Sequence, residues 1–242
     1  MQKIIGRKPV LEALKSEAEI EVVYVAFGQH GDSMSQIYSA AKTRGVKVTQ
    51  IPASKFEVLT DGKIAQGVIA LKSSQKYFEL NELIEKSKAS VNPLLLLLDS
   101  IQDTHNLGAI LRTAECAGAD GVIITTNQSA PINETVEKIA AGAVSHLRIC
   151  KVVNLVRTIE DLKKNGFWIV GTHVNGEKNY NQLDYKMPVA LVMGNEEKGI
   201  RKLVAENCDF LVKIPMKGKI DSLNVSVSTG ILLFEINRQR NN

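Results

Sequence analysis

The segment 214–228 gathers hydroxyl and amide side chains at the point where an apolar strand pattern ends and an apolar helix pattern begins. Ser222 and Asn224 lie in it, and the start of the expected helix leaves backbone N–H groups free. Such a junction can hold a polar ligand without supplying net charge. The ordinary alternative is that Ser222 and Asn224 only cap the helix.

Two earlier segments also follow apolar runs and carry charged and polar side chains. Asn106 can cap a helix on which Arg112 lies about one and a half turns later, so both side chains can face one cleft. Gly194 and Gly199 bracket Glu196, which suggests a close backbone approach with one carboxylate directed into a site. The ordinary alternatives are an N-cap with a surface arginine, and a solvated acidic turn.

The apolar runs that position these segments have the pattern of buried parallel strands. They are Leu94–Leu98, Val122–Thr125, Phe167–Gly171, Val189–Met193 and Phe210–Ile214. Continuous apolar runs that alternate with amphipathic helices predict an α/β fold with a parallel sheet covered on both faces. Ligands of such sheets bind beyond the carboxyl ends of the strands, which is where the three polar segments begin.

The first 72 residues alternate helix and strand patterns of their own. Residues 1–3 are expected to lead into a helix that follows Gly6, and a second helix is expected over Met34–Thr43. The expected strands are Val22–Ala26, Val46–Val48 and Gly67–Leu71. This pattern predicts a small α/β unit separate from the parallel sheet.

The changes in pattern divide the chain into a domain over 1–72, a linker over 73–92 that contains a short charged helix, and a second domain over 93–242. The net charge of the chain is +4, and residues 1–72 carry ten Lys and Arg against seven Asp and Glu, which is +3. This mild excess permits binding to nucleic acid without proving it.

Composition excludes several classes of protein. The chain is 44% hydrophobic and 23% charged, which is ordinary for a globular protein, and no apolar run approaches the roughly 20 residues that cross a bilayer. We therefore expect a soluble, cytoplasmic protein without a membrane partner. Cys116, Cys150 and Cys208 are far apart and are expected to be core or near-core thiols, and no His, Cys or carboxylate spacing indicates a metal site.

Other catalytic motifs are missing from the sequence. No G-x-G-x-x-G or Walker sequence follows a strand, so neither a dinucleotide site nor an NTPase is supported. Ser100 has no nucleophile-elbow context, and no histidine has an evident carboxylate partner, which makes a Ser-His-Asp hydrolase a weak interpretation.

Taken together and in this order, the three polar segments closely resemble the three motifs of the SpoU (TrmH-like) RNA ribose 2′-O-methyltransferases. The matching stretches are N-L-G-A-I-x-R, G-x-E-x-x-G and I-P-M…S-L-N-V-S. In the first domain, Gly6, Val10 and Gln66-Gly67-Val68 most resemble the bacterial branch that modifies a guanosine of large-subunit rRNA. The resemblance covers nearly the whole chain.

The resemblance implies S-adenosyl-L-methionine as methyl donor, bound mostly by backbone groups around five residues. These are Gly171, Thr172, Gly194, Ile214 and Leu223. It also implies a deep trefoil knot in the second domain, an active site completed across a homodimer, and a first domain similar to small ribosomal-protein-type α/β RNA binders.

The resemblance makes Arg112 the central catalytic residue. A guanidinium stays protonated in proteins, so binding the neighbouring phosphate and orienting the hydroxyl suits Arg112 better than acting as a base. Asn106 and Asn224 are expected to position Arg112 and the ribose, Ser222 to bind near the same phosphate, and Glu196 to fix its loop or Arg112 itself.

The expected partner is rRNA, with tRNA as an alternative substrate of the same chemistry. A non-catalytic RNA-binding or ribosome-assembly factor is a further alternative, although such a protein has no chemical need for all five motif side chains. Lys217, Lys219 and Arg201 are candidate RNA contacts near the cleft. Aromatic residues make up only 5% of the chain, which favours recognition of folded RNA through shape and 2′-hydroxyls over stacking of many bases.

Overall fold

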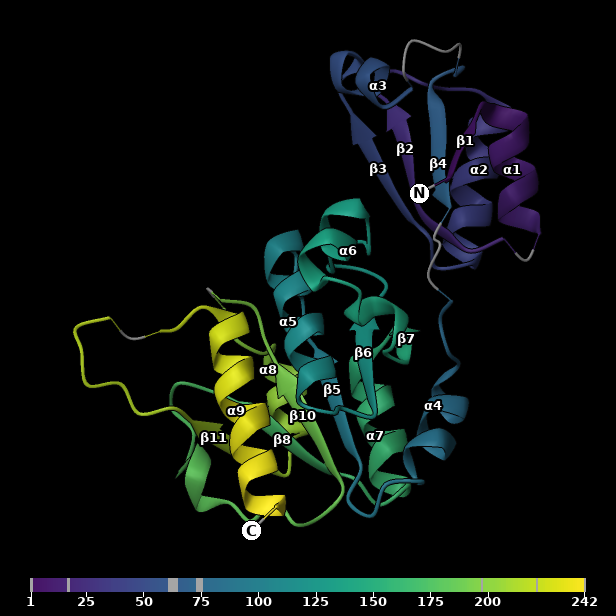
Figure 1. Ribbon diagram of the computed structural model, residues 1–242. Helices are drawn as coiled ribbons and strands as arrows, with labels where there is room; N and C mark the ends of the chain where they lie inside the picture. Colours follow the sequence, from purple (N-terminus) through teal and green to yellow (C-terminus); the bar gives the residue numbers. More distant parts are fainter. Residues whose placement is uncertain are drawn as a thin grey trace. The chain divides into compact units, whose positions relative to one another are not determined.

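The computed structural model describes residues 2–16, 18–60, 65–72, 76–196, 198–220 and 222–241. The chain forms two compact units (Figure 1). The first comprises residues 1–76 with 131–134, and the second comprises 77–130 with 135–242. Each unit has its own sheet, as the two sequence patterns predict.

The first unit is built on a sheet with the strand order β1-β4-β2-β3. Its strands are β1 (Gln2–Ile5), β2 (Ile20–Ala26), β3 (Lys47–Ile51) and β4 (Val68–Lys72), and its helices are α1 (Arg7–Lys15), α2 (Asp32–Thr43) and α3 (Ala53–Thr60). Strand β4 runs antiparallel to β1 and β2, while β2 and β3 are parallel. The carboxyl ends of β1, β2 and β3 therefore share one edge of the sheet with the start of β4.

Both faces of this sheet are covered. Val10, Leu14 and Ile37 of α1 and α2 pack against one face, and Phe56 of α3 packs against the other. The two helices and three strands expected here are confirmed. The expectation that residues 1–3 lead directly into a helix is wrong, because Gln2–Ile5 forms an edge strand and Gly6, with φ of 100°, turns the chain into α1.

The second unit is built on a parallel sheet with the strand order β7-β6-β5-β10-β8-β11-β9. Its strands are β5 (Leu94–Leu98), β6 (Gly121–Thr125), β7 (Ile149–Val152), β8 (Trp168–Thr172), β9 (Lys178–Asn179), β10 (Val189–Met193) and β11 (Phe210–Lys213). Its helices are α4 (Leu80–Ser87), α5 (Thr104–Cys116), α6 (Glu134–Ala140), α7 (Leu155–Lys164), α8 (Lys202–Glu206) and α9 (Val225–Arg240). The predicted α/β class and parallel sheet are confirmed. The trefoil knot stays a prediction.

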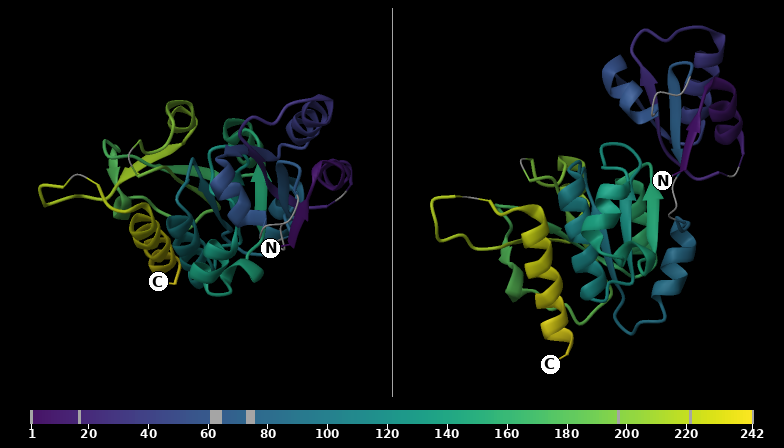
Figure 2. Two further views of the ribbon diagram at one scale, coloured as in Figure 1. Left: turned by 90° about the horizontal axis from the view of Figure 1, so that it is seen from above. Right: turned by 45° about the horizontal axis from the view of Figure 1, so that its top comes forward.

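Helices cover both faces of the parallel sheet, which explains why its central strands are apolar along their whole length. Helices α4, α7 and α8 pack against one face. Helices α5 and α9 lie side by side on the other (Figures 1 and 2). Helix α4 falls within the range 73–92 expected as a linker, and its Leu83 and Ile84 are buried in the core of the second unit.

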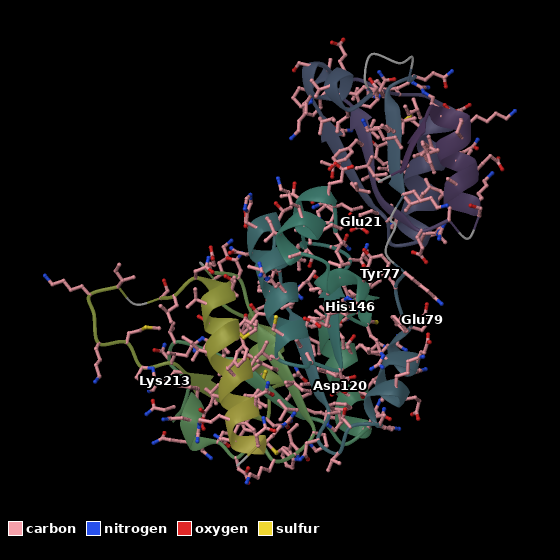
Figure 3. All side chains as sticks on the ribbon, in the orientation of Figure 1. Glu21, Tyr77, Glu79, Asp120, His146 and Lys213 are labelled. Carbon is pink, nitrogen blue, oxygen red and sulfur yellow. The ribbon has the colours of Figure 1, made fainter. Side chains whose placement is uncertain are left out.

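The start of the central strand β5 is fixed by Asp120, which lies just before β6 (Figure 3). Its Oδ2 accepts a hydrogen bond from the backbone N–H of Leu94 at 2.7 Å, and its Oδ1 accepts one from the Ser90 hydroxyl. The carboxylate thereby satisfies a backbone donor at the strand end that the sheet leaves unpaired.

The carboxyl end of α9 is held by Arg240. Its guanidinium donates to the carbonyl oxygens of Tyr185 (3.0 Å) and Met187 (2.8 Å), in the segment that leads into β10. Tyr185 is fully buried, and its hydroxyl donates to the carbonyl of Tyr180 at 2.7 Å. Burial lowers the pKa of Arg240, in keeping with its partly enclosed position. These contacts join the last helix to the strand that carries the Gly194–Gly199 segment.

Replacing Arg240 with Ala should lower the free energy of unfolding by about 1–3 kcal/mol, because two partly buried carbonyls lose their donors. Urea unfolding followed by the fluorescence of Trp168, the single tryptophan of the chain, measures this. Arg238→Ala is the matched control, since Arg238 is exposed and pairs with Glu235 within the same helix turn, so the change should lower the free energy of unfolding much less than Arg240→Ala. Equal losses in the two variants would contradict the anchoring role of Arg240.

Candidate active site

A cavity of about 940 Å³ lies at the carboxyl ends of strands β8, β10 and β11. Residues 172–175, 193–196, 198–199 and 212–216 line it, together with Ser222, Leu223 and side chains from the first turns of α9. This is the edge at which ligands bind in open parallel sheets, and the volume falls in the range of small-molecule sites. Lys213 marks the end of β11 (Figure 3), and the residues that follow it to Met216 line the cavity.

Four of the five residues predicted to bind the cofactor line this cavity, namely Thr172, Gly194, Ile214 and Leu223. Gly171 is not among the described lining residues. A Cβ atom at Gly171 would lie 2.7 Å from the Cys208 Sγ and 2.9 Å from the Ile200 side chain, so this glycine permits close packing of the sheet against the segments on either side of α8. Its placement indicates a packing role.

The backbone at the two ends of the segment 194–199 is in close contact. Asn195 and Gly199 exchange backbone hydrogen bonds of 3.0 and 2.8 Å, and Gly199 has a φ of +64°. A Cβ atom at Gly194 would lie 2.1 Å from the carbonyl carbon of Gly199, which real structures do not allow. Only glycine fits there, and its backbone faces the cavity without a side chain in between.

Glu196 joins the three polar segments. Its Oε1 accepts hydrogen bonds from the side-chain amide of Asn106 at 2.8 Å, from that of Asn224, and from the backbone N–H of Val225 at 3.3 Å. The Asn224 amide also donates to the Asn106 Oδ1 at 2.9 Å. We call Asn106, Glu196 and Asn224 the polar triad. The expectation that a carboxylate is directed into this region agrees with its geometry.

The two asparagines differ in how their helices place them. Asn224 is the N-cap of α9, and its Oδ1 accepts from the backbone N–H of Ser226 at 2.9 Å. Asn106 was expected as a cap, and this is wrong: Asp103 caps α5 and accepts from the Asn106 N–H at 2.8 Å. Asn106 therefore lies inside the first turn, where its side chain is available to Glu196. Ser222 lines the cavity and caps no helix.

Arg112 is exposed on α5 and lies outside the set of described residues that line the cavity. Within the described part of the chain it has no hydrogen bond or ion pair. Glu196 binds the two asparagines and not Arg112. The exposed guanidinium leaves Arg112 available to a ligand from outside this chain.

Arg201 has a structural partner that the sequence did not indicate. Asp99, directly after β5, is fully buried, and its carboxylate accepts from the Arg201 Nε at 2.7 Å and from the Arg201 backbone N–H at 2.8 Å. A buried carboxylate requires such compensation, so Arg201 is committed to Asp99 and is a poor candidate for RNA contact. The only sign of this buried pair in the sequence is that Asp99 directly follows five consecutive leucines, a position where a carboxylate is buried and needs a partner. Lys217 and Lys219 are exposed, as expected.

Two of the three thiols stay in their protonated, weakly nucleophilic form. Burial raises the pKa of Cys150 and of Cys208 to about 12, so both stay protonated. Cys116 is exposed on α5, and its interpretation as a core thiol is wrong. The described residues contain no cluster of side chains suited to a metal ion, and none of the helices described is long and apolar enough to cross a membrane.

The cavity wall suits a ligand with an apolar ring and several polar groups. Met193, Val212, Ile214 and Leu223 supply apolar surface, and Gly194 opens its backbone to close approach. These features fit an adenosyl group held by backbone hydrogen bonds in an apolar slot.

Comparison with known proteins agrees with this geometry. Residues 93–234 match the model of the SpoU rRNA methylase family, and residues 3–78 match the substrate-binding domain of RNA 2′-O ribose methyltransferases. The chain belongs to the SpoU family. This SpoU-family protein is an S-adenosyl-L-methionine-dependent RNA 2′-O-ribose methyltransferase with an N-terminal substrate-binding domain.

Its relatives match over most of their length. A Bacillus subtilis (strain 168) protein assigned to the TrmH family of tRNA/rRNA methyltransferases, YacO, is 38% identical over 98% of this chain and 96% of its own. The AdoMet-bound rRNA methyltransferase from Sinorhizobium meliloti has a TM-score of 0.62 and 29% identity, over 98% of this chain and 86% of its own. The A. aeolicus TrmH/SpoU tRNA modifying enzyme has a TM-score of 0.58 and 36% identity, over 67% of this chain and 82% of its own.

Substituting Gly194 with Ala should weaken the binding of S-adenosyl-L-methionine by about tenfold or more, because the added methyl group displaces the backbone of Gly199. Isothermal titration calorimetry measures this directly. Gly218→Ala is the matched control, since its Cβ atom would meet only the Ile220 nitrogen at 4.0 Å. Unchanged affinity in Gly194→Ala would exclude this loop from the cofactor site.

Proposed function

We propose that this SpoU-family enzyme methylates the ribose 2′-hydroxyl of a guanosine in large-subunit rRNA. The polar triad carries the proposal, because one carboxylate brings the three motif segments together beside the cavity. The rRNA methyltransferase from Sinorhizobium meliloti supports rRNA as the substrate class, since it matches across both units. The resemblance of Gly6, Val10 and Gln66-Gly67-Val68 to the guanosine-specific branch supports the nucleotide.

The domain roles follow from the same assignment. Residues 1–72 bind the RNA, and residues 93–242 carry the cofactor and the reaction. Within the intervening range 73–92, helix α4 is part of the core of the second unit.

The enzyme has two catalytic tasks. It aligns the ribose 2′-hydroxyl with the methyl donor, and it allows that hydroxyl to lose its proton. The cofactor supplies a methyl group activated by a positive sulfur. The polar triad fixes Asn106 and Asn224 in place, and these residues would position the ribose for methyl transfer. Arg112 binds the adjoining phosphate and orients the hydroxyl, and Ser222 contacts the same phosphate. Alignment of this kind supplies several kcal/mol of the barrier.

A tRNA substrate is the second candidate. It is favoured by the 36% identity to the A. aeolicus tRNA modifying enzyme, which extends over 67% of this chain. The same residues would act in the same way on tRNA, so the choice depends on which RNA accepts the methyl group.

Purified enzyme should transfer labelled methyl groups to unmodified large-subunit rRNA, and mapping should place the label on a guanosine ribose. Arg112→Ala should abolish transfer and leave the affinity for S-adenosyl-L-methionine nearly unchanged, because Arg112 lies outside the cavity lining. Arg157→Ala, which removes an exposed arginine from α7, is the matched control and should keep full activity. Label found only in tRNA would make the second candidate correct.

We further propose that the enzyme is a homodimer that pairs through α5 and α9. Val227 and Phe234 on α9 are 50% and 52% exposed and lie seven residues apart, so they share one face of the helix. Arg112 and Cys116 are exposed on the neighbouring α5. Pairing of two such faces would bury the apolar side chains and bring each Arg112 to the site of the other subunit.

Co-expression of Arg112→Ala with Glu196→Gln, under two different tags, tests this arrangement. If Arg112 acts in the site of the other subunit, the doubly purified heterodimer has one intact site and should show about half of the wild-type activity. Each variant alone should be inactive. An inactive heterodimer would place Arg112 and Glu196 of one chain in the same site.

A further inference from the structure

Phe27 is an exposed aromatic residue at the carboxyl edge of the sheet in the first unit. Its side chain is 59% exposed, and its backbone N–H donates to the Ile51 carbonyl at 3.0 Å. The preceding residue, Ala26, donates to the carbonyl of Gly67 at 3.0 Å. The backbone of Phe27 is thus fixed between β3 and β4, while its ring gains little from burial. A single exposed aromatic residue is ordinary, so a binding role for Phe27 has to be argued from the residues around it.

Arg7, which follows β1, forms hydrogen bonds with the loop after β2 and with the loop before β4 at the same edge. Its Nε donates to the Gln66 carbonyl at 3.0 Å, and its Nη2 donates to the Gln29 Oε1 at 2.6 Å. Its backbone N–H donates to the Gln66 Oε1 at 3.2 Å, and its Nη1 donates to the His30 carbonyl and the Ser33 hydroxyl. These bonds hold the loops in one arrangement before any partner binds.

The network leaves two amide donors without a partner among the described residues. In both Gln29 and Gln66 the Oε1 is taken by Arg7, which fixes the orientation of each amide. Their Nε2 groups have no hydrogen bond to any described residue. Gln29 also lies over Gly67, where a Cβ atom would come within 2.1 Å of its side chain, so the glycine makes room for it. Two oriented N–H₂ groups therefore lie at the same edge of the sheet as Phe27.

Two cations lie at helix starts on the same edge of the sheet. Lys8 is in the first turn of α1 and Lys55 in the first turn of α3, and both are exposed. Neither of these first turns contains an acid, although the helix dipole favours acids there. Helix stability thus does not explain the lysines, whereas attraction of a polyanion does. Asp32 in the first turn of α2 is the one acid of the helix starts described in this unit.

We propose that this edge, made of Arg7, Lys8, Phe27, Gln29, Lys55 and Gln66, binds an unpaired nucleotide of the RNA substrate. The base stacks on Phe27, its acceptor atoms receive hydrogen bonds from Gln29 and Gln66, and Lys8 and Lys55 face the flanking phosphates. Stacking on aromatic side chains is the usual way in which proteins bind unpaired bases. The inference rests on the proposed function, and it adds one stacked base to recognition that otherwise uses shape.

The test compares variants of the full-length enzyme on unmodified large-subunit rRNA and on two labelled RNA probes, a hairpin with an unpaired loop and a duplex of equal length. Phe27→Ala should raise the KM for rRNA and the Kd for the hairpin by about tenfold, with kcat, duplex binding and cofactor affinity nearly unchanged. Phe27→Tyr, which keeps a stacking ring, should behave like the wild type. Val58→Ala removes another exposed apolar side chain, 76% exposed on α3, and should have no effect.

A second pair of variants tests the amide donors. Gln29→Glu keeps an acceptor for Arg7 but replaces the free N–H₂ group with an acceptor, so it should weaken hairpin binding while the unit stays folded. Val58→Glu adds the same charge on α3 and should weaken binding less. Wild-type hairpin affinity in Phe27→Ala, or equal losses for hairpin and duplex, would overturn the inference. A wild-type enzyme that methylates no RNA would instead refute the proposed function, and the hairpin titrations would still decide the inference.

Discussion

The carboxylate of Glu196 is the contact on which the arrangement of the site depends. It receives donors from residues 90 positions earlier and 28 positions later in the chain, and those two residues also bind each other. Each of the three loops alone would sample many conformations, and closing loops of this length costs entropy. The mutual hydrogen bonds hold Asn106, Glu196 and Asn224 in one arrangement, so the three segments are joined at this point.

The parallel sheet explains why these segments can meet at all. Strands β5, β10 and β8 are neighbours in the sheet although β10 comes late in the sequence, so the loops after them lie side by side. Close approach at this edge then requires special residues. Gly194 allows the backbone to fold onto Gly199, and the buried Asp99 holds Arg201, which fixes the far end of the same loop.

The sequence predicts the central architecture well because burial on both faces leaves an unambiguous apolar pattern. Leu94–Leu98 and Val189–Met193 are found with their predicted bounds. Edge strands such as Gln2–Ile5 and Lys178–Asn179 are short and half polar, and they form because a neighbouring strand offers hydrogen bonds, which local pattern does not reveal. Asn106 and Asp103 are both residue types that cap helices, and they lie three residues apart. The sequence alone does not decide between them, and the structure shows that Asp103 is the cap.

Each unit has its own hydrophobic core, with α1, α2 and α3 around one sheet and α4 to α9 around the other. Substitutions in the core of the first unit therefore leave the packing behind the polar triad undisturbed. Selection can act on the choice of RNA and on the chemistry of methyl transfer as two separate traits. A family with this construction can acquire new substrates by drift in its first 70 or so residues while its reaction stays the same.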